Sequence, residues 1–447
     1  MRPCFQKSNF LLPNSTIDMQ AWSVIACDQY TSQQDYWQNV QEVTPDKPST
    51  YHMIYPEVYL QEKDDRISKI QQTTENYAHN NILEEKVKNG FILIERSTFS
   101  GNRMGLLGVI DLEAYDFEPG NVKPIRATEK TIASRIPPRV KIRKGAPLEL
   151  SHVLVLLDDP KDELFSTLMK DKDKYPVLYD FDLMMNGGHI KGYAIEKENA
   201  DHLEAKISSM QQKKELFLSV GDGNHSLATA KACWEEIKKG LNPQEQENHP
   251  ARYAMVEMVN LYSSALIFEP IHRVLFHANM EELYEVLEVS CQQEEAQIQP
   301  GKEIVLYQDH REIGIKLVKQ DDRLPIDILQ AFIDAYRLEH PEVDIDYIHG
   351  QDAMYSLLQT KENCGIFLQR IQKSALFPAI VAGGVLPRKT FPMGEADEKR
   401  FYLEARWIKE KEAVYDISQS SRHGKYLKIS SINSLCQFGL GCFSFFL

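Results

Sequence analysis

The sequence predicts a mixed α/β fold of the α+β kind. Short apolar runs, such as residues 153–157 (VLVLL), alternate with charged amphipathic stretches, such as residues 201–214, and this alternation indicates both strands and helices. Of the 447 residues, 43% are hydrophobic and 10% are aromatic, as in globular proteins and unlike disordered chains. At about 100–200 residues per domain, the chain is long enough for several domains.

A hairpin is the clearest element in the first part of the chain. Residues 91–95 (FILIE) and 106–112 (LLGVIDL) are apolar, and the polar loop between them contains a Ser-Gly-Asn turn, which favours a reversal of the chain. The charged residues 62–77 before it are predicted to form an amphipathic helix.

Strands and helices are predicted to alternate through the middle of the chain. Apolar runs of four to eight residues are typical of buried strands, and charged amphipathic segments are typical of helices. The strands are expected at residues 153–157, 216–220 and 253–259, and the helices at residues 201–214 and 227–239.

The last third repeats the pattern. Residues 304–307 and 313–318 flank a turn at residues 309–311 and are predicted to be strands. An acidic helix is expected to begin at Met280, and residues 326–336 have the apolar spacing of another helix.

Polar clusters divide the chain into candidate regions. Breaks are expected near residues 116–123 and 275–280, where the pattern of elements is interrupted. The apolar end, residues 438–447, is a docked strand, a disordered end or an irregularity of the sequence. The expected regions are 1–118, an N-terminal α/β region, 119–275, a central core, 276–408, a C-terminal α/β region, and 409–447, a tail.

Charge and cysteine usage limit the classes of function. The formal net charge of −14 argues against non-specific binding of nucleic acid. The seven cysteines are scattered without C-x-x-C spacing, which predicts reduced thiols and a cytoplasmic protein. With no run of about 18 apolar residues, no membrane partner is expected.

A glycine loop at residues 221–226 (GDGNHS) is the sharpest candidate site. It joins the predicted strand 216–220 to a helix, so that helix N–H groups and the positive end of the helix dipole would face an anion such as phosphate. The alternative is that Asn224 or Ser226 only caps the helix. The candidate phosphate-binding residues of the loop are Gly221, Gly223, Asn224 and Ser226, and the candidate catalytic residues are Asp222 and His225.

A basic stretch precedes the loop in sequence. It contains Arg126, Lys130, Arg135, Arg139, Lys141, Arg143 and Lys144, with Glu129 among them. These cations form either an anion pocket, in which the positive surroundings would keep Glu129 ionised, or a solvated face.

Two further patterns concern cations and histidines. Residues 386–394, with Arg388 and Lys389, and the following residues 399–403 either supply cations to the same anion or form a surface loop. No pair of histidines has the spacing of a helical zinc site, so a structural zinc is not expected. The histidines beside turn residues are His189, His225, His272 and His349.

These motifs together resemble the DUF1015 family, which is related to the ParB/sulfiredoxin-type fold and to the free-serine kinases built on it. The resemblance runs from about Trp22 to Trp407. It is carried by residues 26–32 (ACDQYTS), 55–59 (YPEVY), 126–131 (RATEKT), 222–226 (DGNHS), 268–273 (FEPIHR) and 386–394 (LPRKTFPMG).

The resemblance implies a ParB-like catalytic core at residues 119–275. It implies that Glu129 deprotonates the serine hydroxyl and that Asp222 lies beside Mg²⁺ and the phosphate. Asn224 and Ser226 depart from the family box, where many relatives have His and Arg. The remaining phosphate-binding candidates are Arg126, Arg139, Arg143, His272, Arg273, Arg388 and Lys389.

The function expected from these residues is transfer of a phosphoryl group to free L-serine, giving O-phospho-L-serine. Phosphoryl transfer needs an anion cradle, Mg²⁺ and a base near the hydroxyl. The expected donor is inorganic pyrophosphate, with ADP or ATP as alternatives. Two other functions stay open: a non-catalytic ParB-like nucleotide-binding module and a metal-dependent phosphoester hydrolase.

Overall fold

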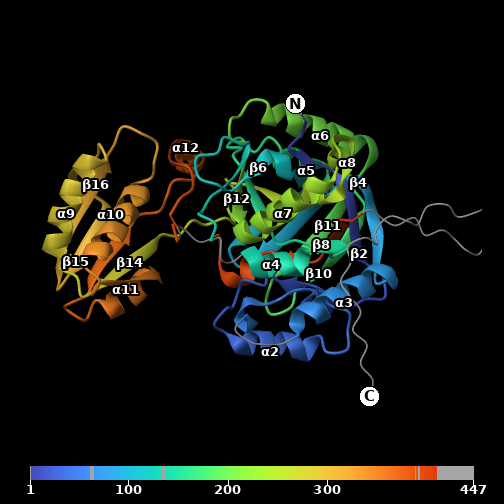
Figure 1. The fold of residues 1–447 in the computed structure, drawn as a ribbon, viewed down its shortest axis with the longest axis horizontal. Helices are drawn as coiled ribbons and strands as arrows, with labels where there is room; N and C mark the ends of the chain where they lie inside the picture. The colour runs from blue at the N-terminus through green and yellow to red at the C-terminus, as the bar shows by residue number, and fades with distance from the viewer. Residues whose placement is uncertain (1, 61–64, 133–135, 388, 391–392, 410–447) are drawn as a thin grey trace, which may run out of the picture. The chain divides into compact units, whose positions relative to one another are not determined.

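The computed structural model describes residues 2–60, 65–132, 136–387, 389–390 and 393–409 (Figure 1). These residues form helices and strands in mixed order, which confirms the predicted α/β class. The narrower assignment to a ParB/sulfiredoxin-type core stays a prediction. Within the described ranges, no helix is both long enough and apolar enough to cross a membrane. The five cysteines that the structure describes are free thiols, as predicted.

The first part of the chain contains the predicted hairpin. Strands β4 and β5 pair antiparallel from Ile92 opposite Leu107 to Thr98 opposite Gly101, and α3 corresponds to the predicted helix. The elements are β1 (Phe5–Gln6), β2 (Ser8–Pro13), α1 (Met19–Trp22), β3 (Val24–Ile25), α2 (Gln34–Val43), the 3-10 helices η1 (Thr50–Met53) and η2 (Glu57–Tyr59), α3 (Arg66–His79), β4 (Leu83–Thr98), β5 (Gly101–Asp111) and β6 (Tyr115–Asp116).

The middle of the chain has the predicted alternation. The three predicted strands are β9, β12 and β13, and the two predicted helices are α6 and α7, each of which begins earlier than predicted. The elements are β7 (Ile125–Ala127), α4 (Ile136–Arg143), β8 (Leu148–Leu150), β9 (Leu154–Leu157), α5 (Phe165–Asp171), β10 (Val177–Asp182), β11 (His189–Ile195), α6 (Lys197–Gln211), β12 (Leu218–Asp222), α7 (Asn224–Ile237), α8 (Pro243–Asn248) and β13 (Tyr253–Asn260).

These strands join in one large mixed sheet. Its main order is β6-β7-β12-β9-β13-β5-β4-β2-β20-β8, where β20 is Ala405–Trp407, with β1 beside β5 and with β11 between β4 and β10. Strand β12 is parallel to β7 and antiparallel to β9. The central strands β9 and β13 are buried almost throughout, which explains why they were recognisable as apolar runs. The sheet places the end of β12 next to the chain that follows β7.

A second sheet forms from the last third, with the order β16-β15-β18-β14-β17 and antiparallel pairing throughout. The predicted strands are β15 and β16, and the predicted helices are α9 and α10. The elements are β14 (Ile271–Phe276), α9 (Met280–Gln293), β15 (Gln297–Gln308), β16 (Arg311–Val318), α10 (Pro325–Glu339), β17 (Asp344–His349), α11 (Gln351–Leu357), β18 (Cys364–Leu368), α12 (Lys373–Gly383), β19 (Phe401–Tyr402) and β20 (Ala405–Trp407).

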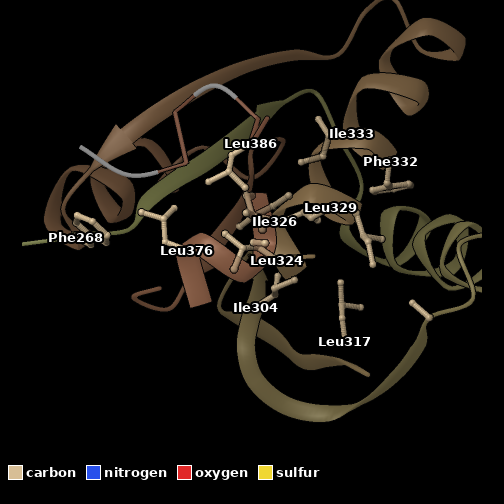
Figure 2. Packing of buried hydrophobic residues seen from close by; sticks show 14 of the residues in the cluster. Phe268, Ile304, Leu317, Leu324, Ile326, Leu329, Phe332, Ile333, Leu376 and Leu386 are labelled. Carbon is tan, nitrogen blue, oxygen red and sulfur yellow. The ribbon is translucent and has the colours of Figure 1, made fainter. Parts of the chain in front are cut away.

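The core of this second part is a cluster of aliphatic and aromatic side chains. Figure 2 shows Leu329 and Phe332 of α10 near Ile304 of β15 and Leu317 of β16. All four are buried, and burying such side chains contributes roughly 1.5–3 kcal/mol each. Both sheets belong to one compact unit of the chain. The division into three α/β regions and a tail stays a prediction.

Candidate functional site

A cavity of about 760 Å³ lies at the junction of β12 and α7. Residues from separate parts of the chain line it, and most are charged or polar. They include Asp28, Gln29, Thr31, Glu57, Glu129, Lys130, the five residues from Gly221 to His225, Tyr347, His349, Lys389, Glu395 and Lys399.

The glycine loop is a strand end followed directly by a helix start. Gly223 has φ +79°, and a Cβ atom there would lie 3.0 Å from the Cα of Val153, so the position requires glycine. Gly223 is the N-cap residue of α7, and this glycine has no side chain that could accept a hydrogen bond from the first helix N–H groups. The interpretation of Asn224 or Ser226 as a capping residue is therefore wrong. An uncapped N-terminus leaves helix N–H groups available for an anion.

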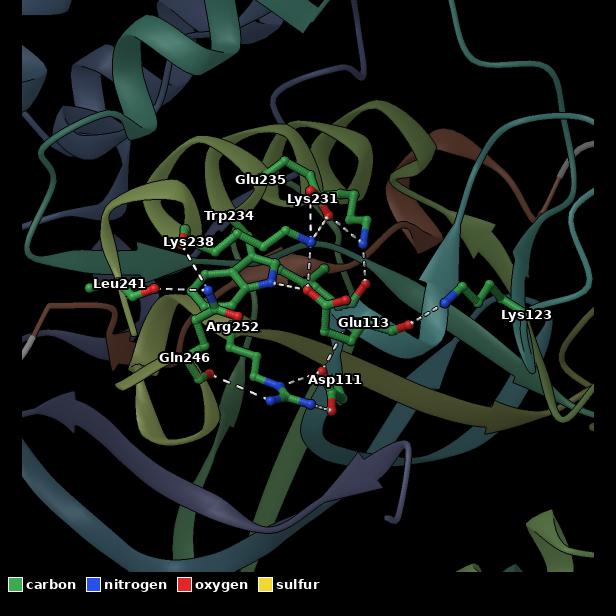
Figure 3. A network of polar contacts seen from close by, with 11 residues as sticks. Asp111, Glu113, Lys123, Lys231, Trp234, Glu235, Lys238, Leu241, Gln246 and Arg252 are labelled. Carbon is green, nitrogen blue, oxygen red and sulfur yellow. Dashed lines mark hydrogen bonds and ion pairs between the residues drawn. The ribbon is translucent and has the colours of Figure 1, made fainter. Parts of the chain in front are cut away.

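Contacts at the other end of α7 hold the helix in place. Figure 3 shows side chains of α7 converging on the residues that follow β5: the indole Nε1 of Trp234 donates to Glu113 at 2.6 Å, and Lys238 pairs with the same carboxylate at 3.0 Å. Lys231 donates to the carbonyl of Leu112 at 2.8 Å. This network fixes the helix whose N-terminus opens into the cavity.

Asp222 is held from two sides. Its Oδ2 lies 3.1 Å from Nζ of Lys399, and its Oδ1 accepts from the N–H of Gly223 at 2.9 Å. The side chains of Asp222 and Lys399 are 19% and 13% exposed, so the pair is shielded but reachable from the cavity. A carboxylate and an ammonium therefore face the same space in a fixed geometry.

Two buried arginines of the hairpin hold the segment that carries Lys399. Arg96 donates to the carbonyls of Lys399 at 2.6 Å and Asp397 at 2.8 Å, and Arg103 donates to the carbonyl of Glu398 at 3.3 Å. Arg96 and Arg103 are cross-strand neighbours, and like charges in this position destabilise a sheet. The three carbonyl contacts, together with the buried Glu257 beside Arg103, offset this cost.

Glu129 lies on the segment after β7. A bridge to Leu386 and a backbone hydrogen bond from Lys389 place its carboxylate in the cavity. Burial raises the pKa of Glu129 above its ordinary value, the nearby Asp222 adds to this rise, and Lys389 and Lys399 lower it less. The expectation that positive surroundings dominate at Glu129 is therefore wrong. A raised pKa suits a group that must accept a proton near neutral pH.

His225 occupies the first turn of α7. Its Nε2 accepts from the backbone N–H of Ile132 at 3.1 Å, so the neutral ring carries its proton on Nδ1. The contact ties the glycine loop to the segment that follows Glu129. The catalytic role of His225 stays a prediction.

Asp28 is a charged group that sequence reasoning did not single out. Its Oδ2 lies 3.5 Å from Nε2 of His152, and Nδ1 of that buried histidine lies 2.6 Å from the hydroxyl of Tyr402. Burial acts to raise the pKa of Asp28, but the nearby His152, Gln29 and Lys399 together outweigh it and hold this pKa well below its usual range. Asp28 is therefore an ionised group in the cavity wall.

The structure brings together part of the predicted set. Glu129, Gly221, Asp222, Gly223, Asn224, His225 and Lys389 all line the cavity.

Other predicted residues lie elsewhere. Arg126 is buried and pairs with Glu215 at 2.9 Å. His272 and Arg273 are buried in β14, where Arg273 stacks on Tyr347. Arg388 lies outside the described residues, as do Arg135 and residues 410–447.

A second cavity is lined by three of the remaining residues that were predicted to bind phosphate. Ser226, Arg139 and Arg143 line it. Arg139 pairs with Glu57, and Arg143 pairs with Glu149 at 2.6 Å.

Several lining residues were missed as individual candidates. Asp28 and Glu57 belong to segments that carry the family resemblance, so a signal was present but did not single out these carboxylates. Tyr347 and His349 come from β17, and the sequence offered no sign that the edge of the second sheet borders this cavity.

The site also fits a divalent cation. Among the residues that the structure describes, no three His, Cys, Asp or Glu side chains form a metal cluster, but Mg²⁺ is commonly held by one or two protein oxygens plus substrate phosphates. Asp222 provides a carboxylate, and the Oδ1 of Asn224 is buried without a partner in the described part of the chain. Five carboxylates against three lysines line the cavity, a balance that favours a cation beside any bound polyanion.

No curated protein matches the chain in sequence. Among solved structures, a conserved hypothetical protein from Pyrococcus furiosus has 9% identity and a TM-score of 0.32, covering 67% of this chain and 94% of its own. A free serine kinase in complex with AMP has 10% identity and a TM-score of 0.34, with coverage of 67% and 90%. SbnI with a C-terminal truncation, from Staphylococcus aureus, has 9% identity and a TM-score of 0.33, with coverage of 66% and 82%.

The comparison with protein families extends over most of the chain. A family described as "Protein of unknown function (DUF1015)" matches residues 11–336. This match confirms the resemblance inferred from the motifs: the chain belongs to the DUF1015 family.

Proposed function

We propose that the protein is a small-molecule kinase that transfers a phosphoryl group to free L-serine and forms O-phospho-L-serine. The observation that carries this proposal is the pairing of Asp222 with Lys399 beside the uncapped N-terminus of α7, in the cavity that also contains Glu129. A fixed carboxylate, a cation, the N–H groups of a helix N-terminus and a partly buried base are the parts that phosphoryl transfer needs. The motif resemblance to free-serine kinases supports serine as acceptor.

Each residue has a defined part in the transfer. Glu129 accepts the proton of the serine hydroxyl. As the proton leaves, the hydroxyl oxygen of the substrate serine forms a bond to the terminal phosphorus of the donor. The bond from that phosphorus to the bridging oxygen breaks, and the shortened donor leaves with the electron pair. Lys399 and the N–H groups of α7 stabilise charge on the phosphoryl oxygens. Asp222 and Asn224 would hold Mg²⁺, which neutralises charge on the donor phosphates.

We propose inorganic pyrophosphate as the donor. The helix N-terminus and the lysines of the cavity are groups that bind phosphate, and pyrophosphate is the most compact of the three candidate donors. ADP and ATP present the same group, so they are the direct competitors in any test.

The test is product formation by the purified protein. Incubation with L-serine, Mg²⁺ and pyrophosphate, ADP or ATP is expected to yield phosphoserine, identified by mass spectrometry. Absence of phosphoserine with all three donors would contradict the proposal. Phosphate release that is independent of serine would instead indicate a phosphoester hydrolase, and nucleotide binding without turnover would indicate a binding module.

A further inference from the structure

The second cavity adjoins the first and has a different character. Its volume is about 150 Å³, and apolar side chains such as Ile54 and Leu150 form much of its wall. Glu57 lines both cavities. Ser226 of the second cavity directly follows His225 of the first along α7, so the two spaces meet at the start of this helix.

The wall of this cavity also contains charged side chains, which form ion pairs with one another. Arg139 and Arg143 lie four residues apart on α4; Arg139 pairs with Glu57, and Arg143 pairs with Glu149 at 2.6 Å. Glu149 also accepts from Nε of Arg406 at 2.7 Å. Two guanidinium groups and two carboxylates therefore line the cavity, and this balanced set suits a ligand that carries both an ammonium and a carboxylate.

Glu57 in the wall of this cavity can accept further hydrogen bonds. One of its carboxylate oxygens accepts a hydrogen bond from Arg139, and the other accepts none from any residue that the structure describes. Arg143 uses one of its N–H groups for Glu149, and its others make no hydrogen bond within the described ranges. A carboxylate acceptor and guanidinium donors are thus both available at one small apolar space.

We propose that this second cavity is a binding site for a small zwitterionic amino acid, with the α-ammonium on Glu57 and the α-carboxylate on the guanidinium group of Arg143. Its volume accommodates on the order of ten non-hydrogen atoms, which suits a free amino acid and is too small for a nucleoside or a peptide. The apolar walls strengthen both charge contacts by excluding water.

The proposal rests on the proposed function in one respect: it takes L-serine as the amino acid and the cavity as the acceptor side of the reaction. Because Glu57 belongs to both cavities, an amino acid bound to it lies beside the phosphate-binding space. The order of the two sites explains how a free amino acid, and not a serine within a protein, would be selected.

The first test uses the unaltered protein without any donor. Calorimetry with L-serine is expected to show binding, whereas N-acetyl-L-serine, which lacks the ammonium, and L-serine methyl ester, which lacks the carboxylate, are expected to bind at least about tenfold more weakly. Equal binding of either derivative would overturn the zwitterion site. Binding of a different amino acid in place of serine would support the site and contradict the serine kinase function. No binding of any amino acid would overturn the site.

The second test locates the binding. Ala146 lines the cavity, and Ala146→Phe is expected to abolish L-serine binding while leaving pyrophosphate binding unchanged. Glu57→Gln, which keeps the shape and removes the charge, is expected to weaken serine binding by about tenfold or more. Glu339→Gln, an exposed position on α10, is the matched control and is expected to bind like the unaltered protein. Unchanged serine binding by a folded Ala146→Phe protein would overturn the location.

Discussion

Asp222 and Glu129 are two carboxylates in one cavity with opposite surroundings. Asp222 has an ammonium partner 3.1 Å away, whereas burial is the dominant influence on Glu129 and raises its pKa. Environments that differ in this way separate carboxyl groups into different chemical roles. Asp222 is suited to holding a cation, and Glu129 to exchanging a proton.

We expect Asp222→Asn to abolish phosphoryl transfer and to keep the fold. An amide retains the shape and the contact with Gly223, but it is a poor ligand for Mg²⁺ and leaves Lys399 without its counter-charge. Phosphoserine formation and thermal unfolding measure the two effects. Asp322→Asn, at an exposed position, is the matched control. Near-normal turnover by Asp222→Asn would contradict the assigned role.

Glu129→Gln is expected to lower kcat by about 10²–10⁴-fold with little effect on KM, because a positioned base contributes about this much. A change in KM alone would make Glu129 a binding residue instead. In the unaltered enzyme, the rate should rise with pH as the raised pKa of Glu129 is passed.

The same substitution is expected to stabilise the protein at neutral pH. The folded-state pKa of Glu129 is raised, so this residue stabilises the fold while protonated, and that contribution is lost as the pH rises through the folded-state pKa. Glutamine carries no charge and therefore avoids the cost of ionising a partly buried carboxyl group. Denaturant unfolding at pH 5 and pH 8 measures the difference in stability between the variant and the parent. A variant less stable than the parent at pH 8 would argue against a raised pKa of Glu129.

At the scale of the element, α10 contains a testable carboxyl group at its start. Asp327 accepts from the N–H of Leu324 at 2.8 Å, but its other oxygen is buried with no hydrogen-bond partner in the described part of the chain. Burial raises the pKa of Asp327 to about 6. The stabilisation from its protonated form is therefore lost as the pH rises through about 6.

We expect the stability of the Asp327→Asn variant relative to the parent to increase as the pH rises from 5 to 8, with catalysis unchanged. The amide keeps the contact with Leu324 and carries no charge. Urea unfolding at several pH values gives the difference directly. A difference that is constant across this range would show that Asp327 does not titrate there.

Elements with strong apolar runs could be predicted from the sequence, and short ones could not. Strands β9, β12 and β13 are buried through most of their length, so their composition reveals them. Strands β1 and β20 have two and three residues, too few for any periodicity. They exist because neighbouring strands pair with them, which is tertiary information.

The candidate site could be predicted where its residues are contiguous. The glycine loop is read from consecutive residues, and so is its junction with α7. The basic residues in and after β7 were more difficult to interpret, because Arg126, Arg139 and Arg143 each pair with a carboxylate outside the basic stretch. No property of the basic stretch itself shows which of its cations are already neutralised by partners elsewhere in the chain.

At the scale of the whole molecule, the choice of donor depends on how the separate segments form one cavity. We expect kcat/KM with pyrophosphate to exceed the values with ADP and ATP at saturating L-serine and Mg²⁺. The reason is that Lys399, Lys389 and the N-terminus of α7, which border the cavity, are all groups of a kind that binds phosphate. A nucleotide that is better by tenfold, about 1.4 kcal/mol in transition-state stabilisation, would reject pyrophosphate and leave the serine kinase proposal intact.

The contacts of Arg96 and Arg103 with residues 397–399 have a consequence for sequence variation. Both arginines donate to main-chain carbonyls, and every amino acid supplies the same carbonyl. The side chain at position 397 can therefore be substituted without moving Lys399. A substitution of either arginine, in a hairpin about three hundred residues earlier in the chain, would displace Lys399. A contact of this kind cannot be recognised from the amino-acid sequence of the segment that it positions.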